Sequence, residues 1–517
     1  MVKTFQTLFL CSFLLTINVA AQAQFSGSGS GTLSDPYIIT TPAQLNEIRN
    51  GLDSHYRLAN DIDLTDYLAP GGAGYAQWGD AGWMSIGHHR EVRDWTEFTG
   101  SLNGAGFKIT GLWINRPDEL YVGFFGSTSG ATIDSLGIEI AEAGIKGGGS
   151  TGGLVGVQGH FNDNISNSYV TGNVSGGYSS GTGISTGVGG LVGMQMGILS
   201  NSYFIGSVTG LSPNGFTGGL AGSSYMSNIS NSYATGSVRG GYAIGGLIGV
   251  ISESKMSNCY AAGSVRSIGV GSHIGGLIGE RQRAVDITNS FFDIQATGQR
   301  NGVGFSNVFG DIQSGITGKI TKKMQVAATF EAWDLSTVWS IYEGYGYPFL
   351  RSFNNDILII PIGGSKIYDG RSAPAPIAFD VVSDNPTVDV AVAKAQLTGE
   401  LAYSIENPTN VGEYVIRQHT LHSFSHQVSF KHDVIYTISP RSITVAAIDE
   451  TIYYGETPAL AYHITSGNLV SGDALRGALH VGNLSVGTHT ITQGTLTAGN
   501  NYLITFSAGR LTILPAR

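Results

Sequence analysis

Histidines are the side chains best suited to bind a metal ion, and the sequence holds 12 of them. None belongs to a His-Glu-x-x-His string, in which two imidazoles on one helix face bind zinc and the glutamate acts as base. His419, His422 and His426 form the densest group. The alternation of a β-strand would place His422 and His426 on one face, with no carboxylate close by. We therefore predict surface histidines, no metal site and no cofactor.

Carboxylates could cleave a polysaccharide, because glycosidases use two of them roughly 5 to 10 Å apart. Between Gly147 and Gly279 the charged residues are few, and none recurs at an equivalent repeat position: Asp163, Arg239, Glu253, Lys255 and Arg266. Asp61 and Asp63 are the best remaining pair, but Asp-x-Asp at a strand end is typical of a turn or cap. We therefore predict no catalytic residues and no enzymatic activity. The open alternative is a carbohydrate-active β-helix enzyme, either a polysaccharide lyase or a glycosidase.

Aromatic and basic side chains gather in one unrepeated segment, residues 75–95, which reads YAQWGDAGWMSIGHHREVRDW. Exposed mixtures of aromatic and polar side chains are typical of surfaces that recognise glycans or proteins. Trp83 and Ile86 fit an apolar core better than a surface. The other members form a candidate binding set in a predicted loop: Trp78, His88, His89, Arg90 and Trp95.

Composition narrows the class of protein that must position these residues. Glycine accounts for 76 of 517 residues, charged residues for 12% and apolar residues for 41%. Charge is too sparse for a long solvated helix or coiled coil, and the apolar share is too high for a disordered chain. The net charge is −10 and no basic stripe is present, so we predict no nucleic acid partner.

Two short strings alternate through the middle of the chain. The first reads GG-L-[VIA]-G, and its leading glycines lie 37, 29, 27 and 30 residues apart: Gly152, Gly189, Gly218, Gly245 and Gly275. The second reads N-[SC]-Y in four copies and N-S-F in a fifth, and supplies two sets of equivalent residues: Asn167, Asn201, Asn231, Asn258 and Asn289, with Tyr169, Tyr203, Tyr233 and Tyr260. A period near 28 with β-rich segments predicts a β-solenoid.

Stacking of the coils would turn equivalent residues into structural ladders, with side-chain amides of the asparagines chained along the axis. The double glycines suit corners that need φ > 0 or close approach of neighbouring coils. Cys259 takes the position that Ser168, Ser202 and Ser232 hold in other repeats, which indicates a small residue in a packed ladder rather than a nucleophile.

The predicted fold class is all-β, with an N-terminal right-handed parallel β-helix followed by two small Ig-like or β-grasp-like modules. The β-helix domain covers residues 24–352, with repeats at about 122–296 and a cap helix at about 41–51, where Thr41 to Gln44 reads as a capping box. The modules cover 353–440 and 441–517, and their ends align. The second stops where a further module would begin, which is typical of a longer array.

The N-terminus has the pattern of a secretory signal. Lys3 precedes an apolar stretch from Leu8 to Val19, and Ala21-Gln22-Ala23 fits the small-x-small rule for cleavage. We predict a removed signal peptide over 1–23 and a secreted or cell-surface location. No later segment reaches the ~18 apolar residues that span a bilayer. Without the signal, Cys259 is the one cysteine, so no intrachain disulfide is predicted.

The repeated strings resemble known bacterial sequences. The GG-L-[VIA]-G and NSYATGSV strings are similar to the GLUG motif of secreted bacterial proteins, and the opening DPYIITTPAQLNEIRN looks like the part commonly attached to it. The last two modules resemble MBG domains of the YDG and YGX types, at Tyr368-Asp369-Gly370 and around Tyr454-Gly455. The resemblance implies an adhesin-like surface protein. GLUG motifs also accompany the zinc peptidase that cuts immunoglobulin A.

We expect a binding or structural protein on the bacterial surface, in which a stalk of β modules displays the β-helix. The expected partners are glycans or extracellular host and matrix proteins. Beside the carbohydrate-active enzyme, a passive spacer within a larger surface protein is the other alternative.

Overall fold

The computed structural model describes residues 25–88, 96–177, 186–269, 272–307, 310, 313–353, 356–383, 388–423 and 426–517. The predicted signal peptide, 1–23, lies outside these residues. The chain divides into two compact units, one that runs to Ile320 and one from Thr321 to Arg517. The structure is nearly all-β, with 9% of it helical. Across the described ranges, no helix has the length and apolar character needed to cross a membrane.

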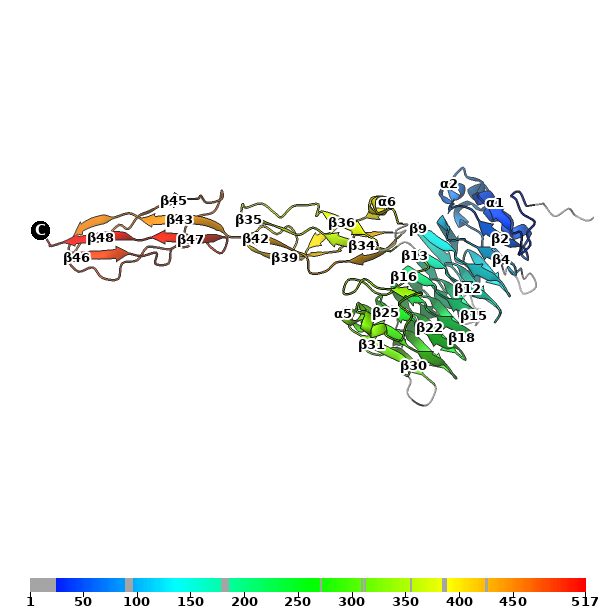
Figure 1. Ribbon diagram of the computed structural model, residues 1–517. Coiled ribbons are helices and arrows are strands. Elements are labelled where there is room, and N and C mark those ends of the chain that lie inside the picture. Colours follow the sequence, from blue (N-terminus) through cyan, green and yellow to red (C-terminus); the bar gives the residue numbers. More distant parts are fainter. Residues whose placement is uncertain are drawn as a thin grey trace, which may run out of the picture. The chain divides into compact units, whose positions relative to one another are not determined.

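The first unit is a parallel β-solenoid of about 7 turns, which Figure 1 shows stacked from β2 to β30. Its described strands form three sheets. Sheet one contains β1 (Tyr37–Ile39), β2 (His55–Leu58), β4 (Ser101–Asn103), β7 (Phe125–Thr128), β8 (Thr132–Asp134), β11 (Val155–Gln158), β12 (Asn164–Ser166), β15 (Val192–Ser200), β18 (Ala221–Ser230), β22 (Ile248–Ser252), β23 (Lys255–Ser257), β27 (Ile278–Gln282), β28 (Asp286–Thr288) and β30 (Val303–Ser306). Sheet two contains β6 (Tyr121–Val122), β10 (Ser150–Thr151), β14 (Gly187–Gly189), β17 (Phe216–Gly218), β21 (Ala243–Gly245) and β26 (His273–Gly275). Sheet three contains β3 (Ile62–Asp63), β5 (Lys108–Arg116), β9 (Gly137–Gly147), β13 (Tyr169–Gly176), β16 (Tyr203–Gly210), β19 (Tyr233–Ala234), β20 (Ser237–Gly240), β24 (Tyr260–Ala261), β25 (Val265–Ser267), β29 (Ser290–Asp293) and β31 (Ile316–Lys319).

Successive turns pass through the three sheets in the same order. One turn runs through β17, then β18, then β19 and β20, and the next begins at β21. Neighbouring turns pair in register, so Phe216 lies beside Ala243 and Ala243 beside His273. Register of this kind stacks equivalent side chains about 4.8 Å apart along the axis. The predicted all-β fold with a parallel β-helix is confirmed.

The interior of the solenoid is apolar and tightly packed. It contains the leucine of each GG-L string, fully buried: Leu154, Leu191, Leu220, Leu247 and Leu277. A Cβ on Gly219 would lie 2.2 Å from the carbonyl oxygen of Gly246 and 2.7 Å from the Cβ of Ala234. None of the glycine pairs in the described GG-L strings has a positive φ. Of the two expected reasons for these glycines, close approach of the coils therefore applies and a positive φ does not.

A short helix covers the start of the solenoid. Helix α1 (Pro42–Glu47) begins after Thr41, whose hydroxyl accepts from the backbone N–H of Gln44 at 3.2 Å, and η1 (Ile48–Asn50) follows. Leu45 and Ile48 are fully buried against the first coils. The other described helices of this unit are α2 (Thr65–Leu68), α3 (Ala73–Trp78), η2 (Gly79–Ala81) and α4 (Ile294–Thr297).

The second unit begins with α5 (Thr321–Met324), η3 (Ala327–Phe330) and the antiparallel pair β32 (Trp339–Ser340) and β33 (Phe349–Leu350). The predicted solenoid domain extended to residue 352, whereas the last solenoid strand ends at Lys319. The physical reason is that Tyr342 and Phe349 pack against Leu358 of the following module.

Two sets of small sheets complete this unit, and Figure 1 shows them in yellow to red. The first set contains β34 (Asp356–Pro361), β35 (Gly364–Ile367), β36 (Phe379–Val382), α6 (Val390–Ala395), β37 (Leu397–Thr398), β38 (Ala402–Tyr403), β39 (Gly412–Arg417), β40 (His422–Ser423), β41 (Gln427–Phe430) and β42 (Ile435–Ser439). The second contains β43 (Arg441–Ala447), β44 (Glu450–Tyr453), β45 (Tyr462–Ser466), β46 (Gly487–Ile491), β47 (Tyr502–Ser507) and β48 (Gly509–Leu514). We call these sets the first and the second module.

Candidate functional site

Four of the five asparagine positions form a chain of amides, which ends at Asn258 because its buried Oδ1 accepts no hydrogen bond from the described residues. Asn201 donates to Asn167 at 3.3 Å, Asn231 to Asn201 at 3.1 Å and Asn258 to Asn231 at 3.2 Å. All of the asparagines at this position, Asn289 included, have a positive φ of 45 to 53°. Asparagine tolerates that conformation better than most residues. The side chains therefore bond along the axis while the backbone turns the corner, so this ladder is structural.

The tyrosine positions form a second ladder. The rings of Tyr169, Tyr203, Tyr233 and Tyr260 stack with centroids 4.9 to 5.0 Å apart and planes within 8° of parallel. None of them is more than 8% exposed. Burial raises the pKa of Tyr169 well above its ordinary value. These rings are therefore packed in the wall and offer no surface to a ligand.

Cys259 lies in a ladder of serines. Ser168, Ser202 and Ser232 each donate to the carbonyl two residues earlier at 2.7 Å, and the Sγ of Cys259 lies 3.1 Å from the carbonyl oxygen of Ser257. Burial raises the pKa of the Cys259 thiol to about 12. A nucleophilic cysteine needs an accessible thiolate, so this thiol is structural.

The carboxylates near the start of the solenoid act as backbone caps. Asp63 accepts from the backbone N–H of Thr65 at 2.8 Å, and hydrogen bonds from Thr65 lower the pKa of this carboxyl. Asp61 accepts from the backbone N–H of Lys108 at 3.0 Å. The buried Asp163 likewise accepts from the N–H groups of Ala131 and His160. Within the described residues, no group of three or more acidic, histidine or cysteine residues could hold a metal ion.

The predicted binding loop is only partly described, because His89, Arg90 and Trp95 lie outside the described residues. Trp78 ends α3 and packs inward, with its ring 5.3 Å from that of the fully buried Trp83. The Arg49 guanidinium lies 5.1 Å from the ring centroid of Trp78. The backbone N–H of His88 donates to the Thr96 hydroxyl at 3.1 Å. The structure therefore places Trp78 in the packing of the cap, while His88 is half-buried beside Thr96.

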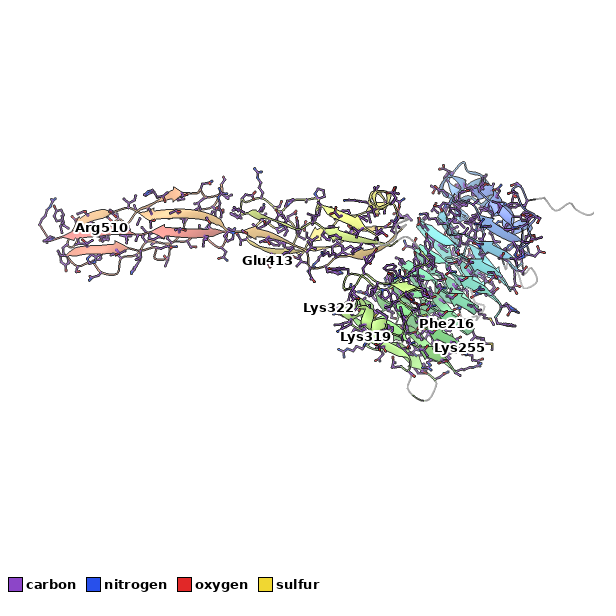
Figure 2. The ribbon with its side chains drawn as sticks, in the orientation of Figure 1. Phe216, Lys255, Lys319, Lys322, Glu413 and Arg510 are labelled. Atoms are coloured by element: carbon purple, nitrogen blue, oxygen red, sulfur yellow. The ribbon has the colours of Figure 1, made fainter. Side chains whose placement is uncertain are left out.

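A different set of aromatic side chains lies on the outer surface of the solenoid. It consists of Phe216, Tyr242, His273 and Phe305, and we call it the aromatic strip. Consecutive ring centroids are 6.4, 4.6 and 4.3 Å apart. All four side chains are partly exposed, and Phe305 at the end is 42% exposed. Figure 2 labels Phe216, which projects from β17.

A buried acid lies under the strip. The Oε2 of Glu280 lies 2.8 Å from the Nδ1 of His273, and Gln282 donates to its Oε1 at 2.6 Å. Glu280 is 5% exposed and pairs across sheet one with Phe305. Burial, followed by the charge and hydrogen bond of Glu280, raises the pKa of Tyr242. This network fixes the imidazole and phenol rings. It leaves the ring edges and the side-chain carbonyl oxygen of Gln282 to contact a ligand.

Sequence reasoning missed the strip for two reasons. Its members occupy different repeat positions, with Tyr242 one residue before the position of Phe216 and His273, and Phe305 in another sheet. Glu280 follows directly after the last GG-L string, one residue beyond the stretch from Gly147 to Gly279 in which charged residues are few. The available signal was the variable residue two positions before each double glycine, which is aromatic at Phe216 and His273.

Comparison with known proteins assigns two of the repeats and most of the second module. Residues 215–239 and 240–266 match the GLUG motif, and residues 443–512 match the MBG domain of the YGX type. The chain carries GLUG motifs and an MBG domain. The first GLUG motif contains Phe216 and the second contains Tyr242, so half of the aromatic strip belongs to matched motifs.

Two curated relatives match part of the chain. A protein of Evansella cellulosilytica, provisionally named a Gly-rich membrane protein, is 39% identical over 131 residues, 24% of this chain and 14% of that protein. The halomucin of Haloquadratum walsbyi is 38% identical over 151 residues, 28% of this chain and 1% of that protein. The matched stretches thus span a small fraction of either relative.

Two solved structures also align with the chain. One is a Bacteroides ovatus protein provisionally assigned as an immunoglobulin A1 protease, with 18% identity and a TM-score of 0.38 over 63% of this chain and 94% of that chain. The other is described as an IgA1 protease, with 17% identity and a TM-score of 0.29 over 55% of this chain and 20% of that chain.

Proposed function

We propose that this is an adhesin-like protein of the bacterial cell surface, which binds an extracellular glycan on the aromatic strip of its GLUG solenoid. The GLUG and MBG assignments, with relatives named as a membrane protein and a halomucin, support the surface location. The observation that carries the binding role is the strip itself, a row of partly exposed rings beside polar groups. Exposed aromatic side chains held rigidly on a scaffold are the usual anchors of a recognition surface.

The chemistry of the strip suits a sugar chain better than a charged ligand. Ring edges and the exposed part of Phe305 offer apolar contact. The side-chain carbonyl oxygen of Gln282 and the phenolic oxygen of Tyr242 can accept hydrogen bonds from sugar hydroxyls, while their donor groups bond to Glu280. The carboxylate of Glu280 is buried and engaged by His273 and Gln282, so it positions these side chains rather than acting as an acid or base. The proposed function is therefore binding without catalysis.

Binding of the full chain to immobilised bacterial, plant and host glycans, with matrix proteins in parallel, tests the proposal. Phe216→Ser and Phe305→Ser should each weaken glycan binding at least tenfold, because each removes an apolar anchor that lies on the surface. Phe161→Ser is the matched control, since Phe161 is 63% exposed on the same solenoid outside the strip and its loss should change affinity less than twofold.

Three results would overturn the proposal. Equal binding by the strip variants and the control would remove the strip as the site. Binding to matrix proteins alone would replace the glycan with a protein ligand. Release of reducing sugar or of an unsaturated product from a bound polysaccharide would show that the solenoid is an enzyme.

A further inference from the structure

The two modules of the second unit are joined by a shared acid. Asp473 of the second module accepts hydrogen bonds from two phenols, at 3.0 Å from Tyr368 of the first module and at 2.7 Å from Tyr502 of its own. The two phenol rings meet edge to face with centroids 5.5 Å apart. Tyr368 is only 6% exposed as a result. One carboxylate thus bridges Tyr368 of the first module and Tyr502 of the second, at the place where the two modules meet.

A second contact joins the residues just before β39 to the following module. The Oδ1 of Asn501 accepts from the backbone N–H of Val411 at 2.9 Å, and its Nδ2 donates to the Oδ1 of Asn410 at 3.0 Å. The backbone carbonyl of Asn501 also accepts from the N–H of Arg441, the first residue of the second module. Val411 packs against the apolar core that the two modules share. The second module therefore contacts the first through Asp473, Asn501 and Tyr502.

Strand register shows which residues of the second module are equivalent to Tyr368 and Val411. Ile438 pairs with Lys366 and Gly412, and in the second module Ile513 pairs with Ile452 and Gly487. Counting along the strands from these pairs places Tyr454 at the position of Tyr368 and Val486 at the position of Val411. The backbone hydrogen bonds agree with this equivalence. The backbone N–H of Tyr368 donates to the carbonyl of Ser439 at 2.9 Å, and that of Tyr454 donates to the carbonyl of Leu514 at 2.8 Å.

The equivalent residues differ in exposure. Tyr454 is 56% exposed where Tyr368 is 6% exposed, and Val486 is 50% exposed where Val411 is packed against the shared core. Leu484 and Leu514, beside them, are 48% and 37% exposed. The second module thus repeats, at its far end, the tyrosine and the valine with which the first module contacts its neighbour, and Leu484 and Leu514 add apolar surface beside them. We call Tyr454, Leu484, Val486 and Leu514 the end face.

We propose that the end face binds the opening end of another MBG module of the same type. The incoming module would present its equivalents of Asp473, Asn501 and Tyr502, with the acid accepting from the Tyr454 hydroxyl and the amide accepting from the N–H of Val486. The proposal does not depend on the glycan proposal. The existing junction specifies this occupant, because it shows both halves of the contact in one chain.

The test replaces Ala516 and Arg517 with a second copy of residues 441–517. The copy then follows Pro515, as the second module follows Pro440. Hydrogen exchange at the Val486 amide should then slow at least tenfold, as expected for a newly made hydrogen bond. An appended copy that carries both Asp473→Ala and Asn501→Ala should restore the rate of the unextended chain. A copy with Leu503→Ser, which alters a residue 60% exposed outside these contacts, should leave the exchange slow.

A second measurement uses the unextended chain. Asn501→Ala removes the acceptor of the Val411 amide, so it should speed exchange at Val411 at least tenfold and leave Val486 unchanged. The proposal is overturned if extension does not slow exchange at Val486, if the copy with both substitutions slows it as much as the natural copy, or if Asn501→Ala leaves Val411 protected.

Discussion

The effect of Cys259→Ser on the free energy of unfolding tests whether the Cys259 thiol is structural. Cys259→Ser should change the free energy of unfolding at pH 7 by less than about 1 kcal/mol, because serine makes the same bond to the backbone in neighbouring coils. Its folded pKa, raised from 9.0 to about 12, lies above that of the unfolded chain. The unfolded chain therefore loses the proton first, and this thiol costs stability as pH rises from 9 to 12.

Denaturant unfolding of the natural protein and of Cys259→Ser at pH 7 and at pH 10 measures the effect. The natural protein should lose more stability over this interval than the variant, which has no thiol to ionise. Tyrosines ionise in the same range, but they are present in both proteins and cancel in the difference. Equal losses in the two proteins would contradict the assignment of Cys259 as a fully buried thiol.

Residue types and spacing showed which positions repeat, but not the backbone conformation of each. The asparagine amides were expected to chain along the axis, and the structure has those bonds from Asn167 to Asn258. The double glycines were expected to provide either a positive φ or close approach of the coils; they provide close approach, and the positive φ falls on the asparagines. Both residue types fit a left-handed turn, so sequence alone does not choose between them. The aromatic strip was missed because its contacts join different repeat positions across two sheets.

The glycine pairs make the close contact between coils that the solenoid needs. Gly219→Ala should cost about 1–3 kcal/mol, the usual range for overpacking, because its Cβ would meet the Gly246 carbonyl at 2.2 Å. Gly269→Ala is the control, since its Cβ would meet nothing closer than 3.8 Å and its φ is not in the left-handed region. Chemical unfolding followed by circular dichroism compares the two variants. Similar midpoints for both would refute the close-approach explanation.

Element boundaries were predictable only where the repeat is strong. The 28-residue period was enough to predict parallel coils, because no single coil can bury its apolar face alone. Past the last repeat, glycine content no longer separated solenoid from module. Residues 321–353 belong with the second unit because Tyr342 and Phe349 pack on Leu358, a contact between side chains that no spacing rule reveals.

At the scale of the whole molecule, each compact unit has its own apolar core. The large solenoid cluster lies within the unit that ends at Ile320, and the cluster shared by the two modules lies within residues 321–517. Two separate cores predict two unfolding transitions for the full chain, so a single two-state analysis does not apply. Gly219→Ala should lower one transition midpoint and Tyr368→Phe, which removes a bond to Asp473, the other.

Differential scanning calorimetry of the full chain and of both variants measures this assignment. The Gly219→Ala variant should shift only the solenoid transition, and the Tyr368→Phe variant only that of the modules, by a few degrees for each 1 kcal/mol lost. The variant that carries both Gly219→Ala and Tyr368→Phe should show both shifts, because sites that share no partners have additive effects. If either substitution moved both transitions together, the two units would unfold as one cooperative structure, and the assignment of one transition to each core would be wrong.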